Sequence, residues 1–247
     1  MARSKKKLAF VTGASRGIGN AIARGLLEAG YRVACGYNAH AAGAAGLERE
    51  FPEALAVAID MRSRASIRRA IAATEKRFGG TIDILVNNAA IADEKPFAEI
   101  SDADWDRMLQ TNLRGPFALA QEVLPAMRRK HWGRIVNIVS IGGQWGGMRQ
   151  VHYAAAKAGL INFTHSLAKL YSRDGITANA VSPGLVATDM TKKELRSKAG
   201  KAKAAQIPIG RVTEAGEIAA AVVFLCSDKA GSITGHTLNV NGGLYFQ

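Results

Sequence analysis

Residues 8–19 read LAFVTGASRGIG, an apolar run followed by a glycine-rich turn and the start of a helical pattern that continues to Gly30. The apolar run predicts a buried strand. Glycines at positions 13, 17 and 19 allow the backbone to turn sharply and to approach a ligand closely. The helix that follows directs its free amide groups at the turn, an arrangement that binds a pyrophosphate. The segment therefore predicts the start of a nucleotide-binding α/β domain, although its G-x-x-x-G-x-G spacing differs from the G-x-G-x-x-G fingerprint.

Apolar runs alternate with helical patterns along the rest of the chain. The further predicted strands cover residues 31–37, 54–60, 82–87, 135–139, 176–181 and 236–240. The predicted helices cover residues 41–51, 64–78, 101–130, 151–173 and 214–227, and within the third of these Asn112 is either exposed or placed at a break. This alternation predicts a parallel sheet covered by helices on both faces. Because the sequence contains no linker or repeat, residues 1–247 are expected to form a single doubly wound Rossmann-type α/β domain of about seven strands.

The composition is that of an ordinary globular protein, with 48% hydrophobic and 21% charged residues in a chain of 247. No run approaches the ~20 apolar residues of a membrane span, and residues 1–7 carry no apolar signal region, so a cytoplasmic protein without membrane contact is expected. The two cysteines, Cys35 and Cys226, give neither a disulfide framework nor the spacing of a metal site. The net charge of +13 favours acidic partners, or it reflects solubility alone, and the sequence leaves both options open.

A second segment, residues 140–157, brings together groups that are suited to proton transfer. Ser140 follows the predicted strand 135–139, and Tyr153 and Lys157 project from one face of the next predicted helix because they lie one turn apart. A lysine cation near a tyrosine favours the phenolate and lowers the tyrosine pKa from about 10. The phenol can then donate a proton to a substrate oxygen that Ser140 orients. Taken alone, the Tyr-x-x-x-Lys pair is more typical of a plain helix face with an extended lysine.

The end of the second predicted strand bears on the choice of nicotinamide cofactor. NAD-specific folds place an acidic residue ~20 residues after the glycine turn, where it binds the ribose hydroxyl. Here residues 37–40 are Tyr-Asn-Ala-His, and Arg16 lies in the glycine turn. A missing carboxylate and a nearby guanidinium favour a 2′-phosphate and hence NADP(H), unless Arg16 is a solvated loop cation. Asp60, at the end of the third strand, is either an acceptor for the adenine amine or an ordinary turn residue.

Together, the short motifs of this chain resemble those of the short-chain dehydrogenase/reductase family. They occur in the expected order over essentially the whole chain: Thr12-Gly-x-x-x-Gly-x-Gly19, Asn87-Asn-Ala89, Asn112, Ser140, Tyr153-x-x-x-Lys157 and Pro183-Gly184. Within the family the chain is most similar to bacterial 3-oxoacyl-(acyl carrier protein) reductases. The resemblance implies that Tyr153 protonates the substrate oxygen while Ser140 holds it. It also implies that Lys157 tunes Tyr153 and binds the nicotinamide ribose, and that Asn112 holds a water of the proton relay.

The resemblance further implies a cofactor site for NADP(H) and no metal. On the adenosine and phosphate side it comprises Gly13, Ser15, Arg16, Gly17, Ile18, Gly19, Asn38, Asp60, Met61, Asn87 and Ala89. Towards the nicotinamide it comprises Tyr153, Lys157, Pro183, Gly184, Val186 and Thr188.

Some positions depart from the family pattern. Ala90 replaces a usual glycine, His152 replaces a usual asparagine, and the substrate loop is bulky and basic at Trp145, Met148 and Arg149. These departures leave the acyl specificity open, so reduction of acetoacetyl-CoA or another small ketone is the alternative activity. A non-enzymatic regulator that senses NADP or binds nucleic acid is a third hypothesis. The presence of all four implied catalytic residues, Asn112, Ser140, Tyr153 and Lys157, disfavours it.

Two kinds of partner follow from the same resemblance: an acidic acyl carrier protein that carries the 3-oxoacyl substrate, and copies of this chain in a homotetramer. Helices near 112–130 and 151–172 and the apolar segment 238–245 offer surfaces for the tetramer. For the carrier protein, the candidate docking cations either bind it or merely cap helix ends. They are Arg128, Arg129, Lys130 and Arg173, or else Lys192, Lys193 and Arg196 in the polar segment 187–206, which we interpret as a lid.

Overall fold

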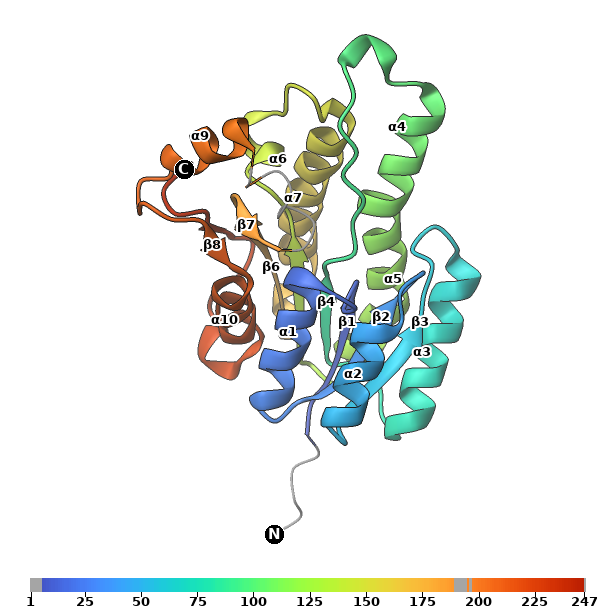
Figure 1. Cartoon of the computed structure of the whole chain (residues 1–247). Helices are drawn as coiled ribbons and strands as arrows, with labels where there is room; N and C mark the ends of the chain where they lie inside the picture. Colours follow the sequence, from blue (N-terminus) through green and yellow to red (C-terminus); the bar gives the residue numbers. More distant parts are fainter. Residues whose placement is uncertain (1–5, 189–194, 196, 247) are drawn as a thin grey trace.

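A seven-stranded parallel sheet forms the centre of the molecule (Figure 1), as the alternating sequence pattern predicts. The computed structural model describes residues 6–188, 195 and 197–246. In it the strand order is β3-β2-β1-β4-β5-β6-β9, and every neighbouring pair is parallel. The strands are β1 (Leu8–Thr12), β2 (Arg32–Tyr37), β3 (Ala54–Ala58), β4 (Ile84–Asn87), β5 (Gly133–Ile138), β6 (Ile176–Pro183) and β9 (Thr237–Val240).

Helices cover both faces of this sheet, and the side chains of β1 show why. Successive strand side chains point to opposite faces. Ala9 and Val11 therefore pack on one face, against α1 (Gly17–Glu28), α2 (Ala42–Glu50) and α10 (Ala215–Cys226). Leu8 and Phe10 pack on the other face, against α3 (Arg64–Phe78), α5 (Gly115–Arg129) and α7 (Val151–Tyr171). The predicted doubly wound architecture is confirmed, and none of the described helices is long and apolar enough to cross a membrane.

The helical segment predicted over residues 101–130 is interrupted at Asn112. Its first part, α4 (Asp102–Leu109), begins with a capping box between Ser101 and Asp104. A π-helix (Gln110–Arg114) then separates α4 from α5, and Asn112 is fully buried within it. Of the two options left open by the sequence, the structure therefore selects the break, and such π-helical turns are frequent at functional sites.

Several short elements were not predicted, because they are too short to show a periodicity. The two strands β7 (Val186–Ala187) and β8 (Thr213–Glu214) form a small second sheet. A single helical turn, α6 (Gly142–Trp145), lies between Ser140 and the helix that carries Tyr153. Helix α9 (Lys198–Ala205) lies within the segment 187–206, which is interpreted as a lid. The lid residues Lys192, Lys193 and Arg196 fall outside the described part of the chain.

The order in which successive strands are added to the sheet reverses between β1 and β4. Thr12 joins these two strands at their carboxyl ends. Its hydroxyl donates a hydrogen bond to the carbonyl of Val86, at 3.3 Å, and accepts from the main-chain N–H groups of Asn88 and Ala89, at 2.9 and 3.0 Å. In open α/β sheets the ligand binds in the crevice outside such a switch point. The topology therefore places the binding site above β1 and β4.

Candidate active site

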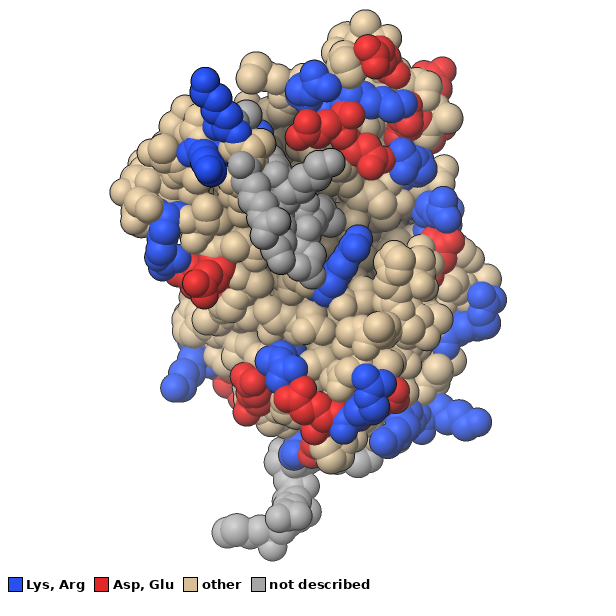
Figure 2. Space-filling view, viewed as in Figure 1, with Lys and Arg blue, Asp and Glu red and all other residues tan. Residues whose placement is uncertain are grey.

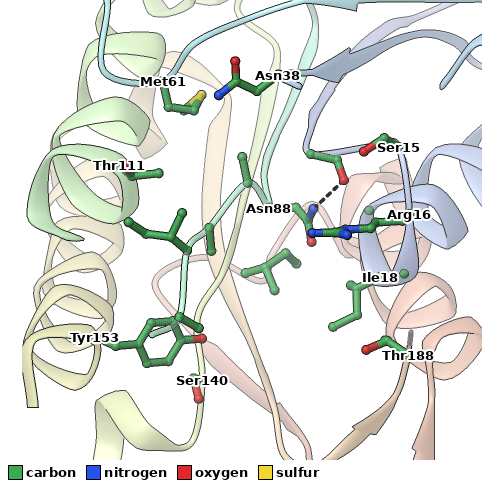
Figure 3. A pocket seen from close by; sticks show the side chains of 18 of the residues that line it. Ser15, Arg16, Ile18, Asn38, Met61, Asn88, Thr111, Ser140, Tyr153 and Thr188 are labelled. Atoms are coloured by element: carbon green, nitrogen blue, oxygen red, sulfur yellow. Dashed lines mark hydrogen bonds between the residues drawn. The ribbon is translucent and has the colours of Figure 1, made fainter. Parts of the chain in front are cut away.

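A cavity of about 610 Å³ opens at this switch point, between the carboxyl ends of the strands and the loops that follow them. In Figure 3, Asn38 and Met61 mark one end of the cavity, and Tyr153 and Ser140 mark the other. Ser15, Arg16 and Ile18 of the glycine turn lie along the wall between them. The cavity therefore extends from Asn38 and Met61, which we call its nucleotide end, to Ser140 and Tyr153, which we call its reactive end.

The glycine turn is packed so closely that two of its residues have no room for a side chain. Gly13 adopts a left-handed conformation, with φ at 68°, and a Cβ at Gly19 would overlap the carbonyl of Gly13 and the amide of Asn88. The Asn88 amide donates hydrogen bonds to the carbonyls of Thr12, at 2.9 Å, and Gly13, at 3.2 Å. This packing holds the start of α1 against the cavity, and Arg16 at its N-cap provides no side-chain cap. The free amides of that turn fit a pyrophosphate.

At the nucleotide end, the cavity is lined by neutral and basic groups together with Asp60. Burial raises the pKa of Asp60, but hydrogen bonds from the main chain and side chain of Arg62 outweigh it and leave the pKa below its usual value. Residues 37–40 line the cavity with no carboxylate, and Arg16 forms no ion pair with any acidic residue in the described part of the chain. This end of the cavity therefore offers a cation and no carboxylate at positions 37–40.

At the reactive end, Ser140, Tyr153 and Lys157 line one wall. Lys157 is only 2% exposed, and its Nζ donates a hydrogen bond of 2.7 Å to the carbonyl of Ile138 at the end of β5. The same Nζ lies 5.6 Å from the centroid of the Tyr153 ring. The Ser140 hydroxyl hydrogen-bonds the Tyr153 phenol and accepts from the N–H of Gly142, at 3.1 Å. A hydroxyl, a phenol and an amine are thus brought together as the sequence predicts.

The pKa values at this end differ from the expectation. Burial raises the pKa of Tyr153, and the hydrogen bond with Ser140 offsets only part of that increase. The prediction of a lowered Tyr153 pKa is therefore wrong, because burial of the phenolate raises the pKa more than the hydrogen bond with Ser140 lowers it. Burial also lowers the pKa of Lys157 to about 8. A raised pKa keeps Tyr153 protonated near neutral pH, as a proton donor requires.

Two of the predicted site residues point away from the cavity. The amide of Asn112 accepts from the N–H of Ile91, at 3.0 Å, and donates to its carbonyl, at 2.8 Å. Asn87 donates to Asn137 inside the sheet, at 2.8 Å, and its neighbour Asn88 lines the cavity instead. Asn112 thus positions Ile91, which does line the cavity.

The remaining predicted residues all line the cavity: Gly13, Ser15, Arg16, Gly17, Ile18, Gly19, Asn38, Asp60, Met61, Ala89, Ser140, Tyr153, Lys157, Pro183, Gly184, Val186 and Thr188. Sequence reasoning missed Asn88, Thr111 and Arg107, which also line it. The Asn87-Asn88 pair was visible in the sequence, but only the direction of the two side chains distinguishes their roles.

A parallel sheet with a nucleotide crevice and a tyrosine–lysine pair at its reactive end defines a nucleotide-dependent oxidoreductase, and comparison with known proteins agrees. The sequence profile of a family described as enoyl-(acyl carrier protein) reductase matches residues 13–245. The chain is 42% identical over 239 residues to the 3-oxoacyl-(acyl-carrier-protein) reductase FabG of Vibrio cholerae, covering 97% of each chain. It is also 42% identical over 243 residues to an acetoacetyl-CoA reductase of Shinella zoogloeoides, covering 97% of this chain and 99% of the relative.

Among solved structures, the fold is similar to that of an Agrobacterium tumefaciens protein described as a candidate gluconate dehydrogenase. The TM-score is 0.91 at 33% identity, over 96% of this chain and 95% of the other. The chain belongs to the short-chain dehydrogenase/reductase family. It is an oxidoreductase that acts on a CH–OH or C=O group with a nicotinamide cofactor.

Burial of Lys157 predicts a dependence of stability on pH. Its pKa is about 8 in the folded protein, against 10.5 for the ordinary amine. The unfolded chain binds more protons between these values, so Lys157 makes the folded state increasingly stable as pH rises through that window, by at most about 1.4 kcal/mol per pH unit. Urea unfolding at pH 7.5, 8.5 and 9.5 measures this effect.

Lys157→Met is the matched control, because it removes this titration, together with the hydrogen bond to Ile138, and leaves the other titratable groups in place. We expect the wild-type protein to gain stability relative to Lys157→Met as pH rises. A difference in unfolding free energy that stays constant with pH contradicts the lowered pKa of Lys157 in the folded protein.

Proposed function

We propose that the chain reduces 3-oxoacyl thioesters carried by acyl carrier protein to 3-hydroxyacyl thioesters, with NADPH as the reductant. The observation that carries the proposal is a single cavity with Ser140, Tyr153 and Lys157 at one end and the uncapped start of α1 along its wall. Similarity over 97% of the chain to a reductase named for that substrate supports the choice of substrate.

In this proposal the residues of the cavity divide the work. The glycine turn and the first amides of α1 bind the pyrophosphate, and bound NADPH supplies the hydride that adds to the carbonyl carbon. Ser140 holds the carbonyl oxygen by a hydrogen bond, and the Tyr153 hydroxyl donates its proton to that oxygen. Lys157, held by Ile138, binds the ribose and favours the phenolate left on Tyr153.

In this proposal Asn112 holds a water of the proton relay through its main chain and not through its side chain. Its side-chain amide is engaged by Ile91, so a water held at this position has to bind the main chain of the π-helix.

Removing the phenol hydroxyl tests the proton donor. Tyr153→Phe keeps the ring and therefore NADPH binding, and we expect kcat to fall by about 10²–10⁴-fold or more, the usual worth of general acid catalysis. Steady-state kinetics and NADPH fluorescence titration measure the two effects separately. A Tyr153→Phe enzyme with a near-normal kcat contradicts the assignment of Tyr153.

The proposed preference for NADPH rests on Arg16, which lacks an acidic partner among the described residues, and on the absence of a carboxylate at positions 37–40. Arg16→Ala is expected to raise the KM for NADPH about tenfold or more, since a charge-assisted hydrogen bond is lost. The KM for NADH, which has no 2′-phosphate, changes little. Equal changes for both cofactors mean that Arg16 does not bind the 2′-phosphate.

Reduction of acetoacetyl-CoA is the second candidate function. Relatives with that name, from Shinella zoogloeoides and Rhizobium meliloti, are also 42% identical to this chain over nearly its whole length. The kcat/KM values for 3-oxobutanoyl groups on coenzyme A and on acyl carrier protein separate the two candidates.

We propose that the carrier protein docks near the end of α5, which lies at the amino ends of the strands and thus at the opposite end of the sheet from the cavity. Arg128 pairs with Asp174 at 2.7 Å, and Lys130 pairs with Asp83 at 2.6 Å. Arg129 and Arg173 are both exposed and have no ion pair with any described residue, so both remain available for an acidic partner.

Arg129→Glu is therefore expected to lower kcat/KM for the carrier-protein substrate about tenfold while a small soluble ketoester is reduced as before. Arg49→Glu on α2, another exposed arginine, is the matched control for the change in net charge. Equal loss with both substrates assigns Arg129 to the fold, and no loss places the docking site elsewhere.

We also propose a homotetramer in the cytoplasm. Phe117 of α5 is 40% exposed and contacts Phe163 of α7, with ring centroids 6.1 Å apart, so the two predicted interface helices share an exposed apolar surface. Light scattering at micromolar concentration tests this, and a monomer contradicts it.

A further inference from the structure

Two aromatic rings from distant parts of the chain meet close to the segment that carries Ser140, although neither ring belongs to the lining of the cavity. Trp145 ends the short helix α6, and Tyr245 lies in the segment that follows β9. Their centroids are 6.0 Å apart and their planes are at 82°, an edge-to-face contact. Trp145 remains 54% exposed, so the pair presents a large apolar surface. Tyr245 belongs to the segment 238–245 that is expected to offer a tetramer surface, and no catalytic or cofactor-binding role assigned above uses either ring.

The position of Trp145 is tied to the catalytic residues. Helix α6 begins two residues after Ser140, and Trp145 is its last residue. Gly143 packs on the main chain of Lys157 so closely that a Cβ would lie 2.8 Å from its carbonyl carbon. The side chain of Gln144 accepts a hydrogen bond of 2.7 Å from the buried hydroxyl of Ser182. Trp145 therefore keeps a constant position relative to Ser140 and Lys157.

The position of Tyr245 is tied to the other wall of the cavity. Asn241 is 4% exposed, and its amide donates a hydrogen bond of 3.0 Å to the carbonyl of Tyr245 and accepts one of 2.9 Å from Gly243. Asn241 also packs against Gly184, which lines the cavity. The segment carrying Tyr245 is thus fastened to the turn that closes the cavity.

The other rim of the cavity is charged and does not suit an apolar chain. Arg107 lines the cavity and pairs with Asp93 at 2.6 Å, and Lys95 pairs with Asp104 at 2.6 Å. Figure 2 shows basic and acidic side chains gathered in the region of α4, at the upper right. A substituent that leaves the carbonyl carbon beside Ser140 and avoids water meets apolar surface on the side of Trp145.

We propose that Trp145 and Tyr245 form an apolar wall that binds the acyl chain beyond the reacting carbonyl, so that the enzyme favours medium-length 3-oxoacyl substrates over the four-carbon substrate. This inference rests on the proposed function, because it concerns the chain of that same substrate. Each methylene buried against the wall contributes about a fourfold gain in kcat/KM. The four-carbon substrate is too short to reach the wall and gains nothing from it.

The experiment measures kcat/KM for 3-oxobutanoyl and 3-oxooctanoyl N-acetylcysteamine thioesters, which carry no protein. In Trp145→Ala we expect the ratio of the eight-carbon to the four-carbon value to fall about tenfold, with the four-carbon value nearly unchanged. Tyr245→Ala lowers the ratio in the same direction because Trp145 loses its support. Tyr245→Phe, which keeps the ring, retains the wild-type ratio.

Met148→Ala is the matched control, because Met148 lies in the same loop and is 96% exposed. It is expected to retain the wild-type ratio. A ratio unchanged in Trp145→Ala, or equal losses with both substrates, overturns the inference while leaving the proposed function intact. A wild-type protein that reduces neither these thioesters nor a 3-oxobutanoyl group on acyl carrier protein overturns the proposed function itself, and this inference with it.

Discussion

The close contact between the glycine turn and the end of β4 is the constraint on which the site depends. Gly19 leaves no space for a side chain next to the Gly13 carbonyl and the Asn88 amide, so the main chain of the turn packs directly against the side chain of Asn88. This contact lets α1 begin directly beside the cavity without a side-chain cap, and its first amides remain available to an anion. Thr12 reinforces the junction from within the sheet, by joining β1 to the start of the loop after β4.

At the other end of the cavity, loss of water is the dominant physical effect. Lys157 is buried with the Ile138 carbonyl as a hydrogen-bond acceptor, and its pKa falls to about 8. The same loss of water raises the pKa of Tyr153. A group held in an unfavourable charge environment lowers stability, but electrostatic interactions there are stronger than in water. The raised Tyr153 pKa and lowered Lys157 pKa are typical of sites that transfer protons.

Local signals in the sequence predicted the regular elements well. The helix over 64–78 matches α3 at both ends, since Ser63 caps its start and Gly79 ends it with a left-handed conformation. From sequence, a break at Asn112 is only one of two options, because the group that binds the Asn112 side chain lies outside the helix, in the main chain of Ile91. The small sheet of β7 and β8 gave no signal, since two-residue strands form only when distant segments meet.

The sequence by itself determined the alternation of strands and helices, the glycine turn, and the shared face of Tyr153 and Lys157, because each follows from spacing along the chain. Tertiary structure alone decided that Asn88 rather than Asn87 lines the cavity, and that the pKa of Tyr153 is raised. It also decided that Trp145 meets Tyr245. The physical reason is that side-chain direction in a strand end, desolvation and ring contacts depend on neighbours that the folded chain brings together, and periodicity carries no information about those neighbours.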